Sequence, residues 1–174
     1  MPLKEEWKAL CAVAVTLLLW ASAFAGIKAG LAAYSPGQLA LLRFIVGSAS
    51  MALYAKARGF GLPEKRDVPT ILRVGFLGFT IYHVFLNYGE QTVSAGAASL
   101  IVSFTPVITA LLAVFLLKER LNVFGWAGIT VSVAGVALIS FGESGGIALG
   151  TGSLLVLVSS LGSSLYNVFQ KPLL

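Results

Sequence analysis

Long apolar stretches separated by short polar connections dominate the pattern along this chain. The clearest one runs from Gln91 to Leu117, carries no charged side chain and stops at Lys118-Glu119-Arg120. Because a helix rises about 1.5 Å per residue, such a run exceeds the roughly 30 Å of bilayer hydrocarbon. Pro106 lies in its middle and frees a backbone carbonyl, which lipid tolerates only where protein or water satisfies it. The run therefore predicts a membrane-spanning helix that faces protein or a cavity on one side.

Six apolar segments have the length of a spanning helix or come close to it. They cover residues 9–27, 36–55, 74–89, 91–117, 123–141 and 153–170. The third is short, so we expect it to extend into the flanking loop or to tilt little. A cleaved signal peptide is the alternative for the first, but its apolar run is longer than the usual stretch of about 7 to 15 residues. The pattern therefore predicts an all-α membrane protein with six transmembrane helices.

Positive charges divide the connections into two kinds. Ten of the twelve Lys and Arg residues belong to the two chain ends or to the second and fourth connections: Lys4, Lys8, Lys56, Arg58, Lys65, Arg66, Arg73, Lys118, Arg120 and Lys171. The third and fifth connections hold Glu90 and Glu143 and no Lys or Arg. Because positive loops stay on the cytoplasmic side, this predicts a multi-pass protein of the plasma membrane with a cytoplasmic N-terminus.

Composition agrees with this prediction and disfavours several classes of function. The chain is 57% hydrophobic and 11% charged, whereas a soluble domain is about 25% charged. With one cysteine and one histidine, we expect no disulfide and no metal site. The acids are dispersed and no phosphate-binding loop is present, so we expect no enzyme and no cofactor. No basic patch carries stacking aromatics, so we also expect no nucleic-acid partner.

Two cations lie apart from the basic connections. Arg43 lies about seven residues, or roughly 10 Å, into the second helix. A charge at that depth is costly and indicates a pathway residue or a structural network, with snorkelling to the headgroups as the alternative. Lys28 is one turn from the end of the first helix and could snorkel more easily. Together these charges would suit a substrate that carries a carboxylate.

The third helix carries its own polar face. His83 and Asn87 are four residues apart, and Glu90 follows a turn later. His83 is either a proton-coupling residue or a histidine packed between helices, since its ordinary pKa lies near physiological pH. Every Asp and Glu lies at or beyond the end of a predicted helix. We therefore expect no carboxylate in the hydrophobic core, which argues against an exchanger of drug cations for protons.

Three further helices have a polar or aromatic face, which should turn toward protein or water rather than lipid. The faces are Trp20, Phe24 and Lys28 on the first helix, Ser103, Pro106 and Ala110 on the fourth, and Ser160, Ser163, Ser164, Asn167 and Lys171 on the sixth. The sequence leaves open whether they line a cavity or join helices. Small residues spaced for close helix packing occur at Gly26 and Gly30, and at Gly128, Ser132 and Gly135.

Several short motifs carry a resemblance to a known family. They are residues 19–28 (LWASAFAGIK), 41–44 (LLRF), 94–100 (SAGAASL), 105–107 (TPV), 118–121 (KERL), 125–128 (GWAG) and 135–139 (GVALI). In order and spacing they resemble the EamA-type transporters of the drug/metabolite transporter superfamily. Residues 163–171 weakly repeat residues 20–28 after five helices, an odd number, so the second copy would be inverted. The resemblance implies ten helices in two inverted five-helix repeats that move small metabolites, often outward. It also implies that Glu119 is tied to a neighbouring helix rather than being a solvated charge.

The chain departs from that pattern by stopping one helix into the second repeat. On this interpretation residues 1–8 are the cytoplasmic N-terminus, 9–142 the first repeat, and 153–174 the first helix of an incomplete second repeat. Either the missing C-terminal repeat belongs to the same full-length chain, or a second copy completes the pathway. We favour the fragment, because in an assembly of two copies the polar face of the sixth helix would meet lipid.

These observations predict a secondary transporter, an exporter of small polar metabolites such as amino acids, that works by alternating access in the lipid bilayer. The candidate substrate-pathway residues are Trp20, Ser22, Phe24, Lys28, Arg43, His83, Asn87, Ser103, Pro106 and Asn167. The alternative is a membrane scaffold or assembly partner that conducts nothing. In that case the polar faces would pair tightly and leave no water-accessible cavity.

Overall fold

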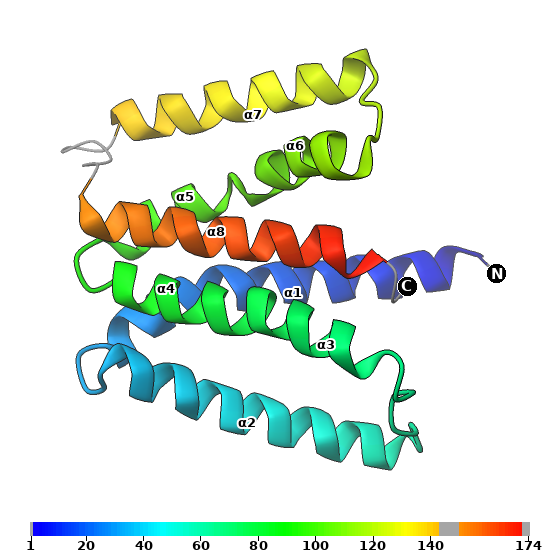
Figure 1. Ribbon diagram of the computed structural model, residues 1–174. Helices are drawn as coiled ribbons and strands as arrows, with labels where there is room; N and C mark the ends of the chain where they lie inside the picture. The colour runs from blue at the N-terminus through cyan, green and yellow to red at the C-terminus, as the bar shows by residue number, and fades with distance from the viewer. Residues whose placement is uncertain (1, 143–149, 172–174) are drawn as a thin grey trace.

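The computed structural model describes residues 2–142 and 150–171, which form a bundle of helices (Figure 1). In chain order the elements are α1 (Pro2–Gly30), α2 (Pro36–Ala57), α3 (Val68–Gly75), the π-helix η1 (Phe76–Ile81), α4 (Tyr82–Gly89), α5 (Ala95–Val102), α6 (Thr105–Leu117), α7 (Val123–Gly142) and α8 (Thr151–Phe169). Each of the six apolar segments predicted from the sequence is helical over most of its length, although the segment 91–117 forms two helices, the first of which begins only at Ala95. The prediction of an all-α membrane protein is confirmed.

Within the described ranges, five segments are long and apolar enough to cross a membrane. They are Trp7–Gly30, Pro36–Ala57, Val68–Gly89, Ala95–Leu117 and Thr151–Phe169. The third combines α3, η1 and α4, and the fourth combines α5 and α6. The third begins at Val68 rather than at residue 74, because a proline in the first turn favours a helix start there. α7 contributes a shorter apolar stretch, Val123–Gly135.

Local sequence fixes where several helices begin and end. The Ser35 hydroxyl accepts a hydrogen bond from the Gln38 amide, and the Gln38 side chain accepts one from the Ser35 amide, so this reciprocal cap starts α2. Ser94 caps α5 by accepting a hydrogen bond from the Ala97 amide at 3.1 Å. α6 ends at Leu117, and the following Lys118 has a left-handed backbone with φ of 55°.

The span Ala95–Leu117 is broken in its middle, as the sequence indicates. Pro106 has no N–H to donate to the preceding turn, and α5 ends at Val102 while α6 begins at Thr105. Beside the break, the carbonyl of Thr105 accepts a hydrogen bond from Ser164 Oγ of α8 at 3.1 Å. The irregular backbone therefore lies against protein rather than lipid, which is where a membrane tolerates it.

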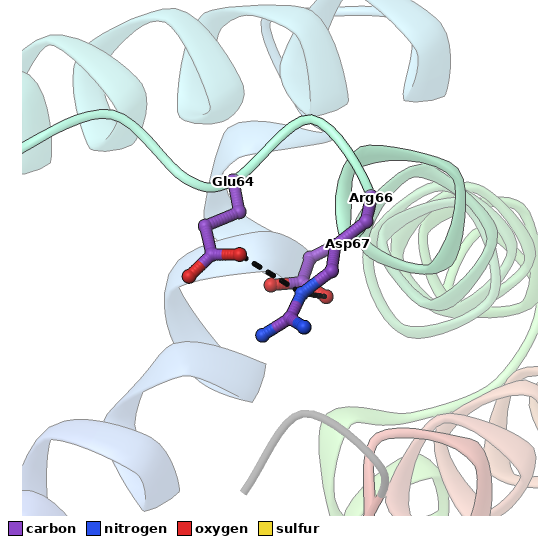
Figure 2. A network of polar contacts seen from close by, with 3 residues as sticks. All are labelled: Glu64, Arg66 and Asp67. Carbon is purple, nitrogen blue, oxygen red and sulfur yellow. Dashed lines mark ion pairs between the residues drawn. The ribbon is translucent and has the colours of Figure 1, made fainter.

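The connections lie alternately at two ends of the bundle (Figure 1). The basic end holds the connections that follow α2 and α6 together with Lys171, and the opposite end holds those that follow α1 and α4. At the basic end, Nε of Arg66 lies 2.9 Å from Oε2 of Glu64 and 3.7 Å from Oδ1 of Asp67 (Figure 2). These side chains are exposed, so the pairs contribute little to stability. Glu143 and the adjoining glycine-rich turn lie outside the described residues.

α8 lies at the centre of the bundle and packs against α4, η1, α5 and α6, whereas α7 lies at the edge (Figure 1). Ser159, Ser160 and Ser164 on α8 are fully buried. Within one chain, α4 and α6 pack against α8, and Ser160 and Ser164 of its predicted polar face are covered by protein. How this face would lie in an assembly of two copies stays a prediction. Whether the remaining pathway comes from a longer chain or a second copy stays a prediction.

An apolar core closes the half of the bundle near the opposite end. Its buried members come from α1, α2, α4, α5, α8 and the segment before α5: Phe24, Ile27, Leu39, Leu86, Val93, Ala97, Ala98, Ile101, Val102 and Val156. Since these residues come from helices far apart in the sequence, burial of their apolar surface holds the spans together at this end.

Glycines allow the span Val68–Gly89 to approach α8 closely. A Cβ on Gly89 would lie 2.5 Å from Val156 Cγ2 and 2.8 Å from the main-chain oxygen of Gly152. A Cβ on Gly78 would meet the Tyr166 ring at 2.5 Å. Such distances exclude any larger residue unless the helices move apart.

The small residues noted in the sequence have different surroundings. A Cβ on Gly26, Gly128 or Gly135 would meet nothing within 4 Å, whereas one on Gly30 would meet Leu39 at 2.9 Å. The prediction of close packing thus holds for Gly30 alone among these glycines within the described part of the chain.

Candidate functional site: a cavity between four spans

A cavity of about 1030 Å³ lies between α1, the segment from η1 to α4, the segment from α5 to α6, and α8. Its polar and aromatic lining residues are Trp20, Phe24, Phe79, Tyr82, His83, Ser99, Ser103, Thr105, Thr109, Glu119, Ser163, Tyr166, Asn167 and Lys171. Because Glu119 and Lys171 are among them, the cavity extends to the basic end. The apolar core closes the opposite half.

The structure brings together six of the ten candidate pathway residues. Those that line the cavity are Trp20, Phe24, His83, Ser103, Pro106 and Asn167. Those that do not are Ser22, Lys28, Arg43 and Asn87. Polar faces predicted separately on the first, fourth and sixth helices therefore converge on one space. The roles of the individual residues in transport stay predictions.

The break in the span Ala95–Leu117 supplies hydroxyl groups to the cavity wall. Ser103 Oγ donates a hydrogen bond to the carbonyl of Ser99 at 2.8 Å. The hydroxyls of Thr105 and Thr109 have no hydrogen-bond partner within the described ranges, although both are buried. Buried polar groups are normally paired, so these two hold unused hydrogen-bonding capacity beside the cavity.

His83 lies among aromatic rings. Its ring centroid is 4.9 Å from that of Tyr82, 5.3 Å from that of Phe44 and 6.5 Å from that of Phe79. Nδ1 is buried and has no partner in the part of the chain that the structure describes. His83 is therefore packed between helices, as one of the two interpretations expects, and it also reaches the cavity. A role in proton coupling stays a prediction.

Asn87 and Ser22 make bonds to the backbone outside the cavity. Asn87 is fully buried and donates through Nδ2 to the carbonyl of Pro36 at 3.1 Å, which ties α4 to the start of α2. Ser22 donates to the carbonyl of Leu19 in its own helix at 2.9 Å. Both contacts are those of structural residues in this arrangement of the helices.

A cluster of charged residues lies at the opposite end, away from the cavity. Lys28 Nζ donates to the main-chain carbonyls of Glu90 at 2.5 Å and Val93 at 2.9 Å, so it ties α1 to the end of α4. Nη1 of Arg43 is buried and has no partner among the described residues. Lys28 thus bonds to main-chain groups of the protein, whereas the snorkelling alternative expects its ammonium group at the lipid headgroups.

Glu90 contradicts the expectation that no carboxylate lies in the core. It follows α4 directly, yet its side chain has no exposed surface, and both carboxylate oxygens lack a hydrogen-bond partner within the described residues. Burial raises the pKa of the Glu90 carboxyl from its ordinary 4.5 to about 7, although the positive charges of Lys28 and Arg43 act in the other direction. The sequence-based prediction failed because the end of a helix is usually exposed, whereas here Lys28 of α1 bonds to the Glu90 main chain and α8 lies against the preceding Gly89.

At the basic end, Lys171 forms an ion pair with Glu119 and joins the end of α8 to the segment after α6. Both side chains are about half exposed. This contact matches the tie to a neighbouring helix that the family resemblance implies for Glu119. It lies at the mouth of the cavity, since both residues line it.

We expect this ion pair to contribute weakly to stability. Charge reversal of Glu119 alone or Lys171 alone should lower the thermal midpoint, and the double reversal should recover part of the loss. A coupling energy of roughly 0.2–1 kcal/mol is typical of exposed pairs. A double-mutant cycle on thermal unfolding measures it, with reversals of Glu64 and Arg66 as the comparison pair. A double reversal as unstable as the sum of the single ones would contradict the tie.

The sequence reading missed several residues of the cavity wall. Thr105 and Thr109 lie four residues apart beside the proline, and Phe79 and Tyr82 belong to the segment that precedes and includes the start of α4. Helical spacing from Pro106 and His83 could have found them. Spacing alone could not have distinguished them from other residues on the same helices, because the packing of the spans decides which face of each helix lines the cavity.

Comparison with known protein families matches residues 7–141 to the EamA-like transporter family. The chain belongs to this family. The match covers α1 to α7 almost completely. No solved structure matches the chain.

Three relatives illustrate the similarity of this EamA chain to known proteins. It is 45% identical over 152 residues to the uncharacterized transporter YdfC of Bacillus subtilis, and the aligned region covers 87% of the chain and 50% of YdfC. It is 38% identical over 167 residues to a probable terminal-alkyne amino-acid exporter of Streptantibioticus cattleyicolor, and the aligned region covers 96% of the chain and 56% of the exporter. An uncharacterized transporter of Archaeoglobus fulgidus is 34% identical over 171 residues, with 98% and 59% covered. The chain therefore spans little more than half the length of these relatives.

Proposed function

We propose that this EamA chain forms part of a secondary transporter that exports small polar metabolites, such as amino acids, across the plasma membrane. The observation that carries the proposal is the cavity of about 1030 Å³, whose wall combines aromatic rings with hydroxyl and amide groups from four spans. Small-molecule sites are commonly concave and apolar with a few polar groups that orient the ligand. The name of the Streptantibioticus relative supports the choice of amino acids.

The distribution of charge around the cavity favours a substrate of zero net charge. Its charged lining residues, Glu119 and Lys171, are paired at the basic end. Trp20 and Phe24 would pack against the apolar part of a solute, and Ser103 and Asn167 would bond its polar groups. An isolated charge would have no counter-ion in the deeper half of the cavity, and burial of such a charge is costly. Lys28 and Arg43 could contact a carboxylate only in a different arrangement of the helices.

The cavity is open at one end of the bundle and closed at the other, as alternating access requires of one state of the transport cycle. The basic end is assigned to the cytoplasm by the positive-inside rule, and the cavity extends to that end. The apolar core and the contact of Gly89 with α8 close the opposite end. The proposal thus assigns the structure to an inward-facing state, and export requires the opposite end to open. Residues 9–142 would be the first repeat, and a second repeat from a longer chain or another copy would complete the pathway.

Cysteine accessibility tests the proposal against the non-conducting scaffold. In a Cys11→Ser background, which removes the only cysteine, Ser103→Cys and Asn167→Cys should react with a small hydrophilic thiol reagent. Ser159→Cys is the matched control, because Ser159 is fully buried on α8 and bonds to the carbonyl of Val156. We expect the cavity positions to react at least about tenfold faster, since the thiolate needs water contact.

A transport measurement completes the test. Membrane vesicles that contain the protein should move radiolabelled amino acids, and an excess of the transported amino acid should slow labelling of Asn167→Cys. Equal labelling of Asn167→Cys and Ser159→Cys, together with no uptake, would support the scaffold.

A further inference from the structure

The buried carboxyl of Glu90 is not used by the proposed pathway. It lies outside the cavity at the opposite end, has no exposed surface, and neither oxygen has a hydrogen-bond partner among the described residues. The ammonium group of Lys28 does not bond to the Glu90 carboxyl, because its Nζ donates to the main-chain carbonyls of Glu90 and Val93. A carboxylate held in this way would be an unpaired buried anion, and such a state is costly.

The charged and titratable groups around Glu90 are few. Lys28 of α1 and Arg43 of α2 act on it through their positive charges, and Tyr82 of α4 lies within electrostatic range. α5 carries no titratable side chain, and Tyr166, the titratable residue of α8, lines the cavity in the other half. The two cations reduce the cost of a buried anion, but neither forms a hydrogen bond to the carboxyl. A bound proton removes that cost directly.

We propose that the Glu90 carboxyl is a proton-binding site whose occupancy stabilises the closed opposite end. When this end is closed, the carboxyl is dry and binds a proton tightly. When it opens, water reaches the carboxyl, and the proton dissociates into the aqueous phase and leaves a solvated carboxylate. Because the closed form binds the proton more tightly, proton binding must favour the closed form by the same factor.

The sign of the resulting pH dependence follows. Burial raises the pKa of Glu90 to about 7 in the closed arrangement, whereas the ordinary pKa of a solvated glutamate is 4.5. The opening equilibrium should therefore rise roughly tenfold from about pH 6 to about pH 8 and level off above that range, and it should continue to fall below about pH 6 until the pH reaches the ordinary pKa of a glutamate. This inference rests on the proposed alternating access, because it concerns the step that opens the opposite end.

A first experiment detects the proton without any substrate. Infrared titration of the purified protein in lipid vesicles should reveal a carboxylic-acid band that disappears as pH rises through about 7. The band should be absent from E90Q and present in E64Q, which removes an exposed carboxylate of the connection between α2 and α3. Superimposable titrations of wild type and E90Q would overturn the assignment. If E90Q does not fold, Glu90→Met provides a second uncharged variant of similar length.

A second experiment measures opening. In a Cys11→Ser background, Val93→Cys places a thiol in the core beside Glu90, and a membrane-impermeant maleimide is added on the side of the opposite end. The thiol itself ionises with pH, so the informative quantity is the labelling rate with Glu90 present divided by the rate in E90Q. This ratio should rise roughly tenfold between about pH 6 and about pH 8. A flat ratio would overturn the proposal.

The outcomes separate this inference from the proposed function. Neither experiment requires a known substrate or a transport signal. If the band and the ratio behave as expected but no solute moves, the transport proposal fails and the proton site stands. If amino acids are transported while both measurements are unchanged in E90Q, the proton site fails and the transport proposal stands.

Discussion

Replacing Gly89 with valine should prevent α4 and α8 from packing and should cause the largest loss of stability that we expect from a single substitution. A Cβ at this position would lie 2.5 Å from Val156 Cγ2 and 2.8 Å from the main-chain oxygen of Gly152. A side chain can rotate away, but a main-chain oxygen moves only with its helix. Overpacking of a close contact costs about 1–3 kcal/mol, and we expect a value at the upper end of this range or above it.

Thermal unfolding of the detergent-solubilised protein measures this loss. Gly26→Val is the matched control, because the same change on α1 meets nothing within 4 Å. Gly89→Val should show a clearly lower midpoint or no monodisperse protein, whereas Gly26→Val should resemble wild type. Equal midpoints would mean that α4 and α8 do not approach as closely as the structure indicates. The central position of α8 would then be wrong.

Replacing Ser103 with leucine should abolish most transport while it leaves the fold intact. Ser103 lines the cavity beside the proline break, and its hydroxyl donates to the carbonyl of Ser99. Leucine removes a polar group and fills space that the solute needs. A polar group of the bound solute would lose the Ser103 hydroxyl as its hydrogen-bond partner. Such a loss costs about 1–3 kcal/mol for a buried group, which corresponds to roughly 5- to 150-fold in rate or affinity.

Ser50→Leu provides a closely matched control for this substitution. Ser50 donates to the carbonyl four residues earlier at 2.8 Å and is exposed, as Ser103 is, but it lies on α2 and does not line the cavity. Initial rates of amino-acid uptake into proteoliposomes, normalised to incorporated protein, compare the two variants. A rate for Ser103→Leu as high as that for Ser50→Leu would remove the cavity from the transport pathway.

Glu90 and the glycines mark the limits of sequence reasoning for this chain. Glu90 follows the last residue of an apolar run, where the sequence pattern predicts a solvated side chain, but it is buried at a helix end that Lys28 of α1 and the first turns of α8 contact. The glycines at 128 and 135 have the spacing of a helix interface, yet a Cβ on either would meet nothing within 4 Å among the described residues, whereas one on Gly89 or Gly78 would meet α8. Spacing records which residues share a face of one helix. It does not record which second helix, if any, comes against that face.

The sequence by itself determined the apolar spans, their alternating direction and the break at Pro106. Each depends on the composition of one continuous segment and on the cost of leaving polar groups in lipid. Tertiary structure decided that faces on α1, α6 and α8 share one cavity, that α8 is central, and that Glu90 is buried. These features depend on contacts between residues far apart in the chain, because burial and desolvation are set by whichever helices surround a side chain.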